Sequence, residues 1–217
     1  MRRVFVDAGS PQRDAIREAA QWIRRGGVVA LPTDTLYGLS ADPFLARAVA
    51  RVFAIKGRAS ENALPLIAAD TEQVRQHLGP LSQVGERLAA RFWPGPLTLL
   101  VSATPALARD VTAGTGRVGV RVPADAVARA VCAAVGRPMT ATSANRSGEP
   151  ATADPDVVER TLGDSLDLLI DAGPTPGGLP STIVDVTENT PRLVRAGAVS
   201  WEDIQACLAT EPPNVLA

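Results

Sequence analysis

The chain has 217 residues and a mass of 22.6 kDa, enough for one large domain or two small ones with a buried core. Hydrophobic residues make up 46% of the chain, and a mean hydropathy of +0.08 excludes intrinsic disorder. The net charge of −1 gives no general attraction to nucleic acids or to anionic membranes.

Compartment follows from the same composition. No apolar run approaches the roughly 20 residues that a membrane-spanning helix needs, and the N-terminus lacks the apolar core of a signal peptide. Cys132 and Cys207 are far apart in sequence, which supports neither a disulfide framework nor a metal site. We therefore expect a cytoplasmic protein without membrane contact.

Extended and helical patterns alternate along the chain. Ser10 followed by Pro11 predicts a helix N-cap, and Gly26-Gly27 is a typical helix end. The predicted helices are 12–25, 45–55, 71–78, 83–92, 125–135, 155–162 and one that begins at a capping box at Ser200. The predicted strands are 2–6, 28–31, 64–69, 97–102, 118–122, 138–141, 168–170, 182–186 and 192–194. This order predicts a single α/β domain over residues 1–217, with one mixed sheet.

Two familiar kinds of site are excluded. Residues 114–119 match the dinucleotide fingerprint G-x-G-x-x-G, but that fingerprint needs a helix after it. The residues that follow alternate as a strand, so a glycine loop is predicted instead. The only histidine, His77, lies in a polar helical segment and is predicted to be a solvated surface residue, which excludes a Ser-His-Asp triad or a histidine zinc site.

Four polar segments remain as candidate site loops: 32–39, 54–58, 142–148 and 179–182. Lysine is nearly absent, since 21 of the 22 basic residues are arginine and Lys56 is the exception. A compact, rotatable ammonium has uses that a planar guanidinium lacks, although chance survival at a helix end is an equal alternative. Together the loops predict a cleft rich in Arg, Lys, Ser, Thr and Asn, suited to a triphosphate and small carboxylates.

The order of these motifs resembles the YrdC family of threonylcarbamoyl-AMP synthases over about residues 26–197. The motifs are PTDTLYGL (32–39), KGR (56–58), FWPGPLTLL (92–100), VGVRVP (118–123), ATSANRSG (141–148), DAGPTPGG (171–178) and STIVDV (181–186). The resemblance implies one twisted mixed-sheet α/β domain, with helices on the sheet and a concave, positively lined cavity. It also implies a reaction of L-threonine, bicarbonate or CO2, and ATP that yields threonylcarbamoyl-AMP and pyrophosphate.

The resemblance carries roles to individual residues. The catalytic cluster would be Lys56, Arg58, Ser143 and Asn145. The ATP contacts would be Arg58, Asn62, Arg117, Ser143, Ala151 and Arg195. The threonine contacts would be Thr35, Arg121, Ala141 and Ser181. Mg2+ is expected to arrive with the triphosphate, and no protein metal site is expected.

The chemistry of these residues agrees with those roles. Arg121 suits a bidentate grip on the threonine carboxylate, whereas Ala141 offers only backbone or apolar contact. Lys56 and Arg58 are expected to face solvent in the cleft, so that replacing either leaves the fold intact. Many family members carry a histidine where this chain has Ile67, and we expect a drier threonine pocket here.

The resemblance also implies a partner, and two alternative functions are considered. The product would pass to a downstream tRNA threonylcarbamoyltransferase. Weak binding of double-stranded or structured RNA is the main alternative, because such RNA is recognised mostly by shape and backbone. A carbamoyl-adenylate site of the kind used in metal-centre maturation ranks third, since the additional modules and cysteines of those larger proteins are absent from this chain.

Overall fold

The computed structural model describes residues 1–57 and 62–209. The helices are α1 (Arg13–Arg24), α2 (Ala46–Lys56), α3 (Thr71–Leu78), α4 (Gln83–Phe92), α5 (Ala126–Val135), α6 (Pro155–Leu162) and α7 (Trp201–Ala209). Two 3-10 helices are η1 (Arg109–Thr112) and η2 (Gly163–Ser165). The strands are β1 (Arg2–Phe5), β2 (Val29–Leu31), β3 (Gly38–Ser40), β4 (Leu66–Ile67), β5 (Leu97–Ser102), β6 (Arg117–Arg121), β7 (Met139–Thr140), β8 (Thr142–Ser143), β9 (Leu168–Asp171), β10 (Thr182–Asp185) and β11 (Arg192–Arg195).

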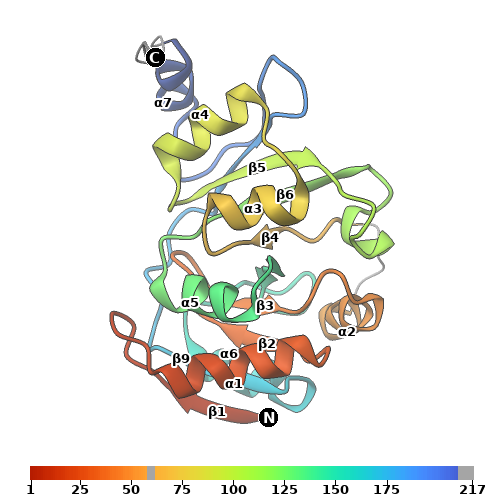
Figure 1. The fold of residues 1–217 in the computed structure, drawn as a ribbon. Helices are drawn as coiled ribbons and strands as arrows, with labels where there is room; N and C mark the ends of the chain where they lie inside the picture. Colours follow the sequence, from red (N-terminus) through yellow and green to blue (C-terminus); the bar gives the residue numbers. More distant parts are fainter. Residues whose placement is uncertain (58–61, 210–217) are drawn as a thin grey trace.

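The strands form two mixed sheets rather than the predicted single sheet. The first has the order β1-β9-β2-β3-β8, and the second has the order β11-β10-β5-β6-β4-β7. Figure 1 shows the sheets one above the other, with α1 in front of the first and α3 in front of the second. The chain passes between them directly from β7 to β8. Strand pairing depends on contacts between distant segments, so the number of sheets is not encoded in local pattern.

The predicted elements are confirmed with small shifts at their ends. Helices α3, α4 and α6 and strand β5 have the predicted bounds. Strands β3 and β8 were missed, because each spans only two or three residues inside a polar motif. β3 pairs with the preceding strand β2, with Leu31 opposite Gly38, and the edge strand β8 pairs with β3, with Gly38 opposite Ser143 and Leu39 opposite Thr142. Edge pairing of this kind exists only after the distant segments have met.

The helix ends test the predicted caps. The N-cap predicted at Ser10 is wrong: Gln12 occupies that position without a side-chain bond, and the Ser10 amide instead donates to Asp7 Oδ1 in a turn. The predicted cap of the last helix is confirmed, since Ser200 Oγ accepts from the Asp203 amide at 3.0 Å. Gly26 has φ of +84°, which allows the chain to leave α1.

Two apolar clusters hold the layers together. The smaller one packs α1 and α5 against each other and against strands of both sheets, and the larger one packs α2, α3 and α4 against both sheets. Cys132 is buried in the smaller cluster, and Cys207 is half-buried on α7; neither forms a disulfide. None of the helices in the described part of the chain is both long and apolar enough to cross a bilayer.

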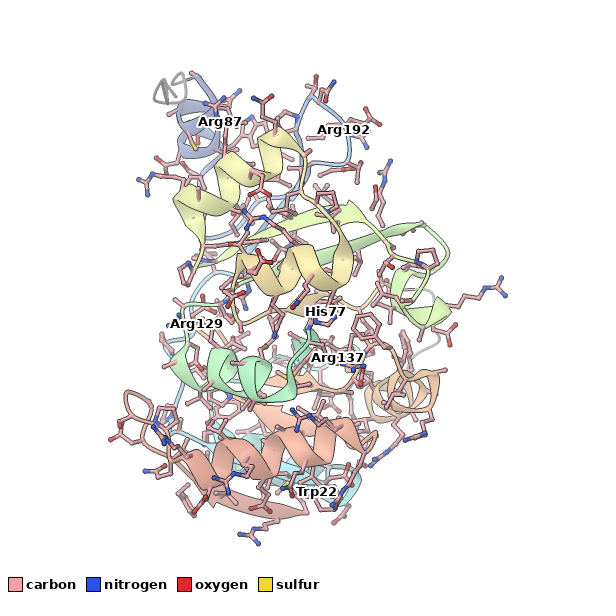
Figure 2. All side chains as sticks on the ribbon, in the orientation of Figure 1. Trp22, His77, Arg87, Arg129, Arg137 and Arg192 are labelled. Carbon is pink, nitrogen blue, oxygen red and sulfur yellow. The ribbon has the colours of Figure 1, made fainter. Side chains whose placement is uncertain are left out.

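Two further expectations are resolved by the packing. Residues 114–119 lead into β6, which confirms that they are not a dinucleotide fingerprint. His77, predicted to be a solvated surface residue, is half-buried, and its ring lies 6.0 Å from the ring of Phe44. The guanidinium of Arg137 lies over the same Phe44 ring at 5.5 Å, and Figure 2 shows Arg137 near His77. His77 therefore contributes to packing between α3 and the segment before α2.

Candidate active site

A cavity of about 400 Å³ lies where the two sheets meet. Both sheets and the loops beside them contribute to its wall. The lining residues are Thr33, Thr35, Leu36, Tyr37, Gly38, Ala63, Pro65, Leu66, Ile67, Thr98, Arg121, Ala141, Thr142, Ser143, Ala151, Pro180, Ser181, Ile183 and Arg195. The volume is in the range of small-molecule sites, and hydroxyl groups and arginines dominate its polar lining.

The cavity floor is one row of side chains across the second sheet. Arg195 lies opposite Ile183, and Ile183 lies opposite Thr98. Ile67 lies opposite Arg121, and all five of these residues line the cavity. Residues paired across neighbouring strands point to the same face of a sheet. Strand register therefore brings two arginines, far apart in sequence, onto one surface.

The two arginines on this floor are electrostatically coupled. Burial lowers the pKa of Arg121, while the charge and hydrogen bond of Asp34 act in the opposite direction. Burial also lowers the pKa of Arg195, and the positive charge of Arg121 lowers it further. The two positively charged guanidiniums therefore repel each other across the floor. An anion placed between them would relieve that repulsion.

Hydroxyl groups connect Arg195 to the floor. Its Nη2 atom donates to the carbonyl oxygen of Ser181 at 2.7 Å and lies 3.3 Å from Ser181 Oγ. Ser181 Oγ is 2.8 Å from Thr98 Oγ1. These contacts hold Arg195 at the start of β10, although all four residues of β11 are exposed.

A buried lysine holds the loop that follows β8. Lys56 Nζ donates to the Ser143 carbonyl oxygen at 2.7 Å and to Asn145 Oδ1 at 2.9 Å, and lies 3.3 Å from Ser143 Oγ. Asn145 Nδ2 in turn donates to the carbonyl oxygens of Arg146 and Glu149. Lys56 is only 3% exposed, so the expectation that it faces solvent is wrong. The end of α2 and its αL cap at Gly57 turn the side chain inward, toward this loop.

A glycine-rich segment, residues 172–180, contributes Pro180 to the cavity lining and is tied to the loop that carries Thr35 and Tyr37. The carbonyl oxygen of Thr35 accepts bonds from the Gly177 amide and from Thr175 Oγ1, both at 2.8 Å. The buried Tyr37 hydroxyl donates to the Gly173 carbonyl oxygen at 2.8 Å. Because this segment ends at Pro180 and is followed by Ser181, these hydrogen bonds help to hold both lining residues in position.

The structure brings seven of the predicted site residues together around the cavity: Thr35, Arg121, Ala141, Ser143, Ala151, Ser181 and Arg195. Lys56 and Asn145 lie behind Ser143. Asn62 is exposed and does not contribute to the lining, and Arg58 lies outside the described residues. Arg117 is on the same face of β6 as Arg121 but outside the lining, where its Nη1 pairs with Asp185 at 2.8 Å.

The chain is similar to known proteins of one family. The family model Sua5_yciO_yrdC, described as telomere recombination, matches residues 21–197. The chain belongs to the Sua5/yciO/yrdC family. A threonylcarbamoyl-AMP synthase of Pyrococcus abyssi is 40% identical over 190 residues, which cover 88% of this chain and 56% of that protein. One of Halorhodospira halophila is 40% identical over 71% of this chain and 81% of its own length.

A solved structure from the same family shares the fold. The crystal structure of P. abyssi Sua5 complexed with L-threonine has a TM-score of 0.91 and 36% identity, covering 96% of this chain and 61% of that one. The chain therefore spans less than two thirds of the P. abyssi protein. Within the matched part, the predicted α/β fold class is confirmed.

Several residues of this Sua5/yciO/yrdC site were not among those predicted from the sequence. Asp34 binds Arg121, Tyr37 anchors the segment 172–180, and Thr98 and Ile183 form part of the floor. Asp34 and Tyr37 fall inside the PTDTLYGL motif and could have been singled out there. Thr98 and Ile183 also fall inside quoted motifs, 92–100 and 181–186, but within those strings they look like ordinary strand residues, and only strand register shows that they face the cavity.

Ile67 forms part of the floor beside Arg121 and is almost fully buried. In this Sua5/yciO/yrdC protein, Ile67 therefore gives the cavity an apolar edge beside Arg121. Among the described residues, no group of three or more His, Cys, Asp or Glu side chains could hold a metal ion.

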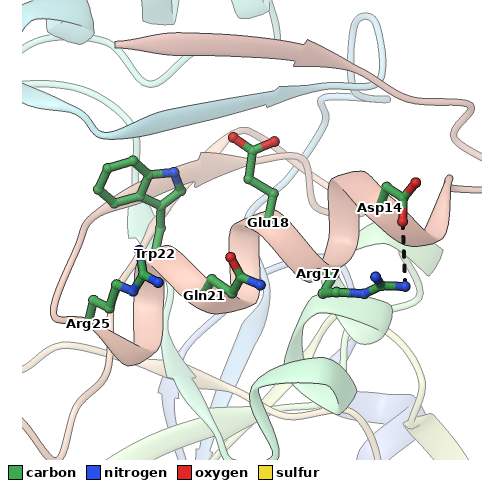
Figure 3. A pocket seen from close by; sticks show the side chains of 6 residues that line it. All are labelled: Asp14, Arg17, Glu18, Gln21, Trp22 and Arg25. Atoms are coloured by element: carbon green, nitrogen blue, oxygen red, sulfur yellow. Dashed lines mark ion pairs between the residues drawn. The ribbon is translucent and has the colours of Figure 1, made fainter.

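A second hollow lies on the outer face of α1 (Figure 3). Its lining comes from this one helix, with Trp22 36% exposed and Arg17 paired with Asp14 at 3.4 Å. No second element in the described part of this Sua5/yciO/yrdC protein supplies a converging group to the lining. Side chains along a single helix make a surface depression, so the cavity between the sheets is the candidate active site.

Proposed function

We propose that this protein is a threonylcarbamoyl-AMP synthase. In the proposed reaction the threonine amine takes up CO2 and releases a proton, giving a carbamate. A carbamate oxygen then forms a bond to the α-phosphorus of ATP, the bond to the bridging oxygen breaks, and pyrophosphate leaves. The names of the two relatives and the threonine complex of P. abyssi Sua5 support this assignment.

The observation that carries the proposal is the pair of arginines on the cavity floor. Both reacting groups are anionic, so their approach needs fixed cations and hydrogen-bond donors. Arg121 and Arg195 supply two guanidiniums on one face, with Thr98 and Ser181 hydroxyls between them. Threonine would place its carboxylate at Arg121, beside Thr35, Ala141 and Ser181. Ile67 would contact its apolar atoms.

The nucleotide would occupy the side of the cavity near Ser143. In the proposed complex Lys56 holds Ser143 and Asn145 in position, and Arg58 completes this catalytic cluster. Arg117 lies four residues before Arg121 on one strand face, roughly 13 Å away at the usual rise per residue. Arginine side chains at this spacing on one strand face could contact different parts of one bound nucleotide. The proposed ATP contacts are Arg58, Asn62, Arg117, Ser143, Ala151 and Arg195.

The proposed reaction also needs a one-carbon donor and a divalent cation. Bicarbonate or CO2 would be the one-carbon donor, and Mg2+ would enter bound to the triphosphate. Residues 1–217 would act as one cytoplasmic domain. The product, a reactive mixed anhydride, would pass to a tRNA threonylcarbamoyltransferase. Direct binding of structured RNA remains the alternative function.

The experiment measures pyrophosphate release from ATP and Mg2+, with L-threonine and bicarbonate each present or omitted and L-serine as a comparison. Release that needs both co-substrates is the expected result. Release that needs carbamoyl phosphate instead of threonine would favour the carbamoyl-adenylate alternative. A folded protein that releases no pyrophosphate under any condition would contradict the proposal and favour RNA binding.

A further inference from the structure

Asp34 and Arg121 form an ion pair at the edge of the cavity. Asp34 lies in the loop between β2 and β3, and Arg121 ends β6 in the other sheet. Arg121 Nη1 donates to Asp34 Oδ1 at 2.7 Å, and the two side chains are only 9% and 13% exposed. A charge pair this well shielded from solvent holds its geometry more firmly than a surface pair does.

The second oxygen of Asp34 is also occupied. Asp34 Oδ2 accepts a bond from the Ala124 amide at 3.2 Å, in the loop between β6 and α5. The carboxylate is therefore held through both oxygens, by groups on either side of Pro123. This arrangement fixes the position of Asp34 relative to the end of β6, and so fixes the part of Arg121 that it binds.

The other edge of the Arg121 guanidinium is directed to the cavity. Within residues 1–57 and 62–209, Nε and Nη2 of Arg121 make no hydrogen bond to protein. The buried side-chain atoms of these residues that lack a hydrogen-bond partner do not include Arg121 Nε or Nη2, so neither nitrogen is fully buried. Both atoms therefore meet open space, and the open space at Arg121 is the cavity that it lines.

We propose that Asp34 is a positioning residue, which holds Arg121 by one edge so that the opposite edge presents two donors to a carboxylate in the cavity. This inference rests on the proposed function, in which that carboxylate belongs to L-threonine. Asp34 lies behind Arg121, outside the residues that line the cavity. It acts on substrate through Arg121 and does not contact the reacting atoms.

The test compares Asp34→Asn with a matched control elsewhere in the chain. Asp167 Oδ2 accepts from Arg51 Nη1 at 2.8 Å and from the Val28 amide at 2.7 Å. Like Asp34, it therefore binds one arginine and one backbone amide, although both bonds reach the same oxygen. Asp167→Asn therefore removes an equivalent carboxylate away from the cavity. Asp34→Glu keeps the charge but lengthens the side chain by one methylene group, which displaces the guanidinium.

Steady-state pyrophosphate release is measured for each variant. For Asp34→Asn we expect the KM for L-threonine to rise about tenfold or more, with the KM for ATP and kcat changed less than about threefold. Asp167→Asn should leave all three parameters unchanged, and Asp34→Glu should give an intermediate threonine KM. A second measurement compares binding of L-threonine with that of L-threoninol, which lacks the carboxylate. Only the affinity for L-threonine should fall in Asp34→Asn.

The outcomes separate this inference from the proposed function. If the unmodified protein shows no threonine-dependent release, the proposed function itself fails. If the unmodified protein is active and folded Asp34→Asn keeps its threonine KM, only the positioning role is wrong. Equal increases in the threonine and ATP KM values, or equal losses of threonine and threoninol affinity, would also overturn it. If Asp34→Asn does not fold, an unchanged threonine KM in Asp34→Glu likewise overturns the positioning role.

Discussion

Lys56 Nζ donates a 2.9 Å hydrogen bond to Asn145 Oδ1, and this contact joins the end of α2 to the loop that follows β8. The same ammonium binds the Ser143 carbonyl oxygen, and the Ser147 amide donates back to the Lys56 carbonyl oxygen. The only lysine of the chain thus organises the loop from within. A guanidinium, which is larger and planar, could not take its place in that buried position.

Replacing Lys56 with Met should reduce both stability and turnover. The change leaves buried acceptors on Ser143 and Asn145 without their charged donor, which costs about 1–3 kcal/mol per group. We expect the free energy of unfolding to fall by at least that amount, and pyrophosphate release to fall about 100-fold or more. Denaturant unfolding and the release assay measure the two effects. Arg13→Ala, at an exposed position on α1, is the control. Full stability in Lys56→Met would refute the organising role.

Replacing Arg121 with Ala should raise the threonine requirement and destabilise the fold. The half-buried Asp34 carboxylate loses its arginine partner but keeps its bond from the Ala124 amide, so we expect a loss somewhat below that of a fully buried unpaired charge, which is about 3–5 kcal/mol. The double variant Asp34→Asn with Arg121→Met should recover part of that loss, because it leaves no charge uncompensated. Chemical denaturation of the unmodified protein, Arg121→Ala and the double variant should give unfolding free energies that are highest for the unmodified protein and lowest for Arg121→Ala. An effect of Arg121→Ala on the ATP KM alone would show that the two substrate pockets are assigned the wrong way round.

Replacing Tyr37 with Phe should loosen the segment 172–180. The hydroxyl donates to the Gly173 carbonyl oxygen and accepts from the Ala172 amide at 3.2 Å, so the change removes two bonds at a buried position. We expect a loss of about 1–3 kcal/mol in unfolding free energy and faster hydrogen exchange across 172–180. Thr175→Val removes a second bond to the same segment, from Thr175 Oγ1 to the Thr35 carbonyl oxygen. The two losses should be non-additive, and strict additivity would argue against a single cooperative segment.

Asp185 should contribute a stability that disappears in acid. Burial alone would raise the pKa of Asp185, but bonds from Thr187 and Arg192 and the charge of Arg117 hold it below its ordinary value. A carboxyl with a lowered pKa stabilises the folded state above its unfolded pKa of about 3.9. That contribution is lost as pH falls through the folded pKa. The direction of the effect is therefore toward lower stability in acid.

The measurement is unfolding free energy from about pH 7 to about pH 2 for the unmodified protein and Asp185→Asn. The difference between the two should be constant above about pH 5 and shrink below about pH 4. Glu188→Gln, at an exposed carboxylate nearby, controls for general charge effects. A difference between the unmodified protein and Asp185→Asn that stays the same across the whole range would contradict the assigned pKa shift.

The amino-acid sequence alone determined the helices and most strands. Apolar periodicity and glycine or proline boundaries depend on neighbours along the chain, so α3, α4, α6 and β5 were predicted to the residue. It also determined the family and part of the cavity lining, because the family motifs carry several of the lining residues as local strings. Seven of the residues predicted in this way lie around one cavity.

Only the tertiary structure decided how those strings meet. Strand register places Arg121, Ile183 and Arg195 in one row, and no local pattern encodes register between distant strands. Burial of Lys56 against Asn145 and the pairing of Asp34 with Arg121 likewise join residues that are 89 and 87 positions apart. Local interactions act along the chain, whereas these contacts exist only after the two sheets have packed together.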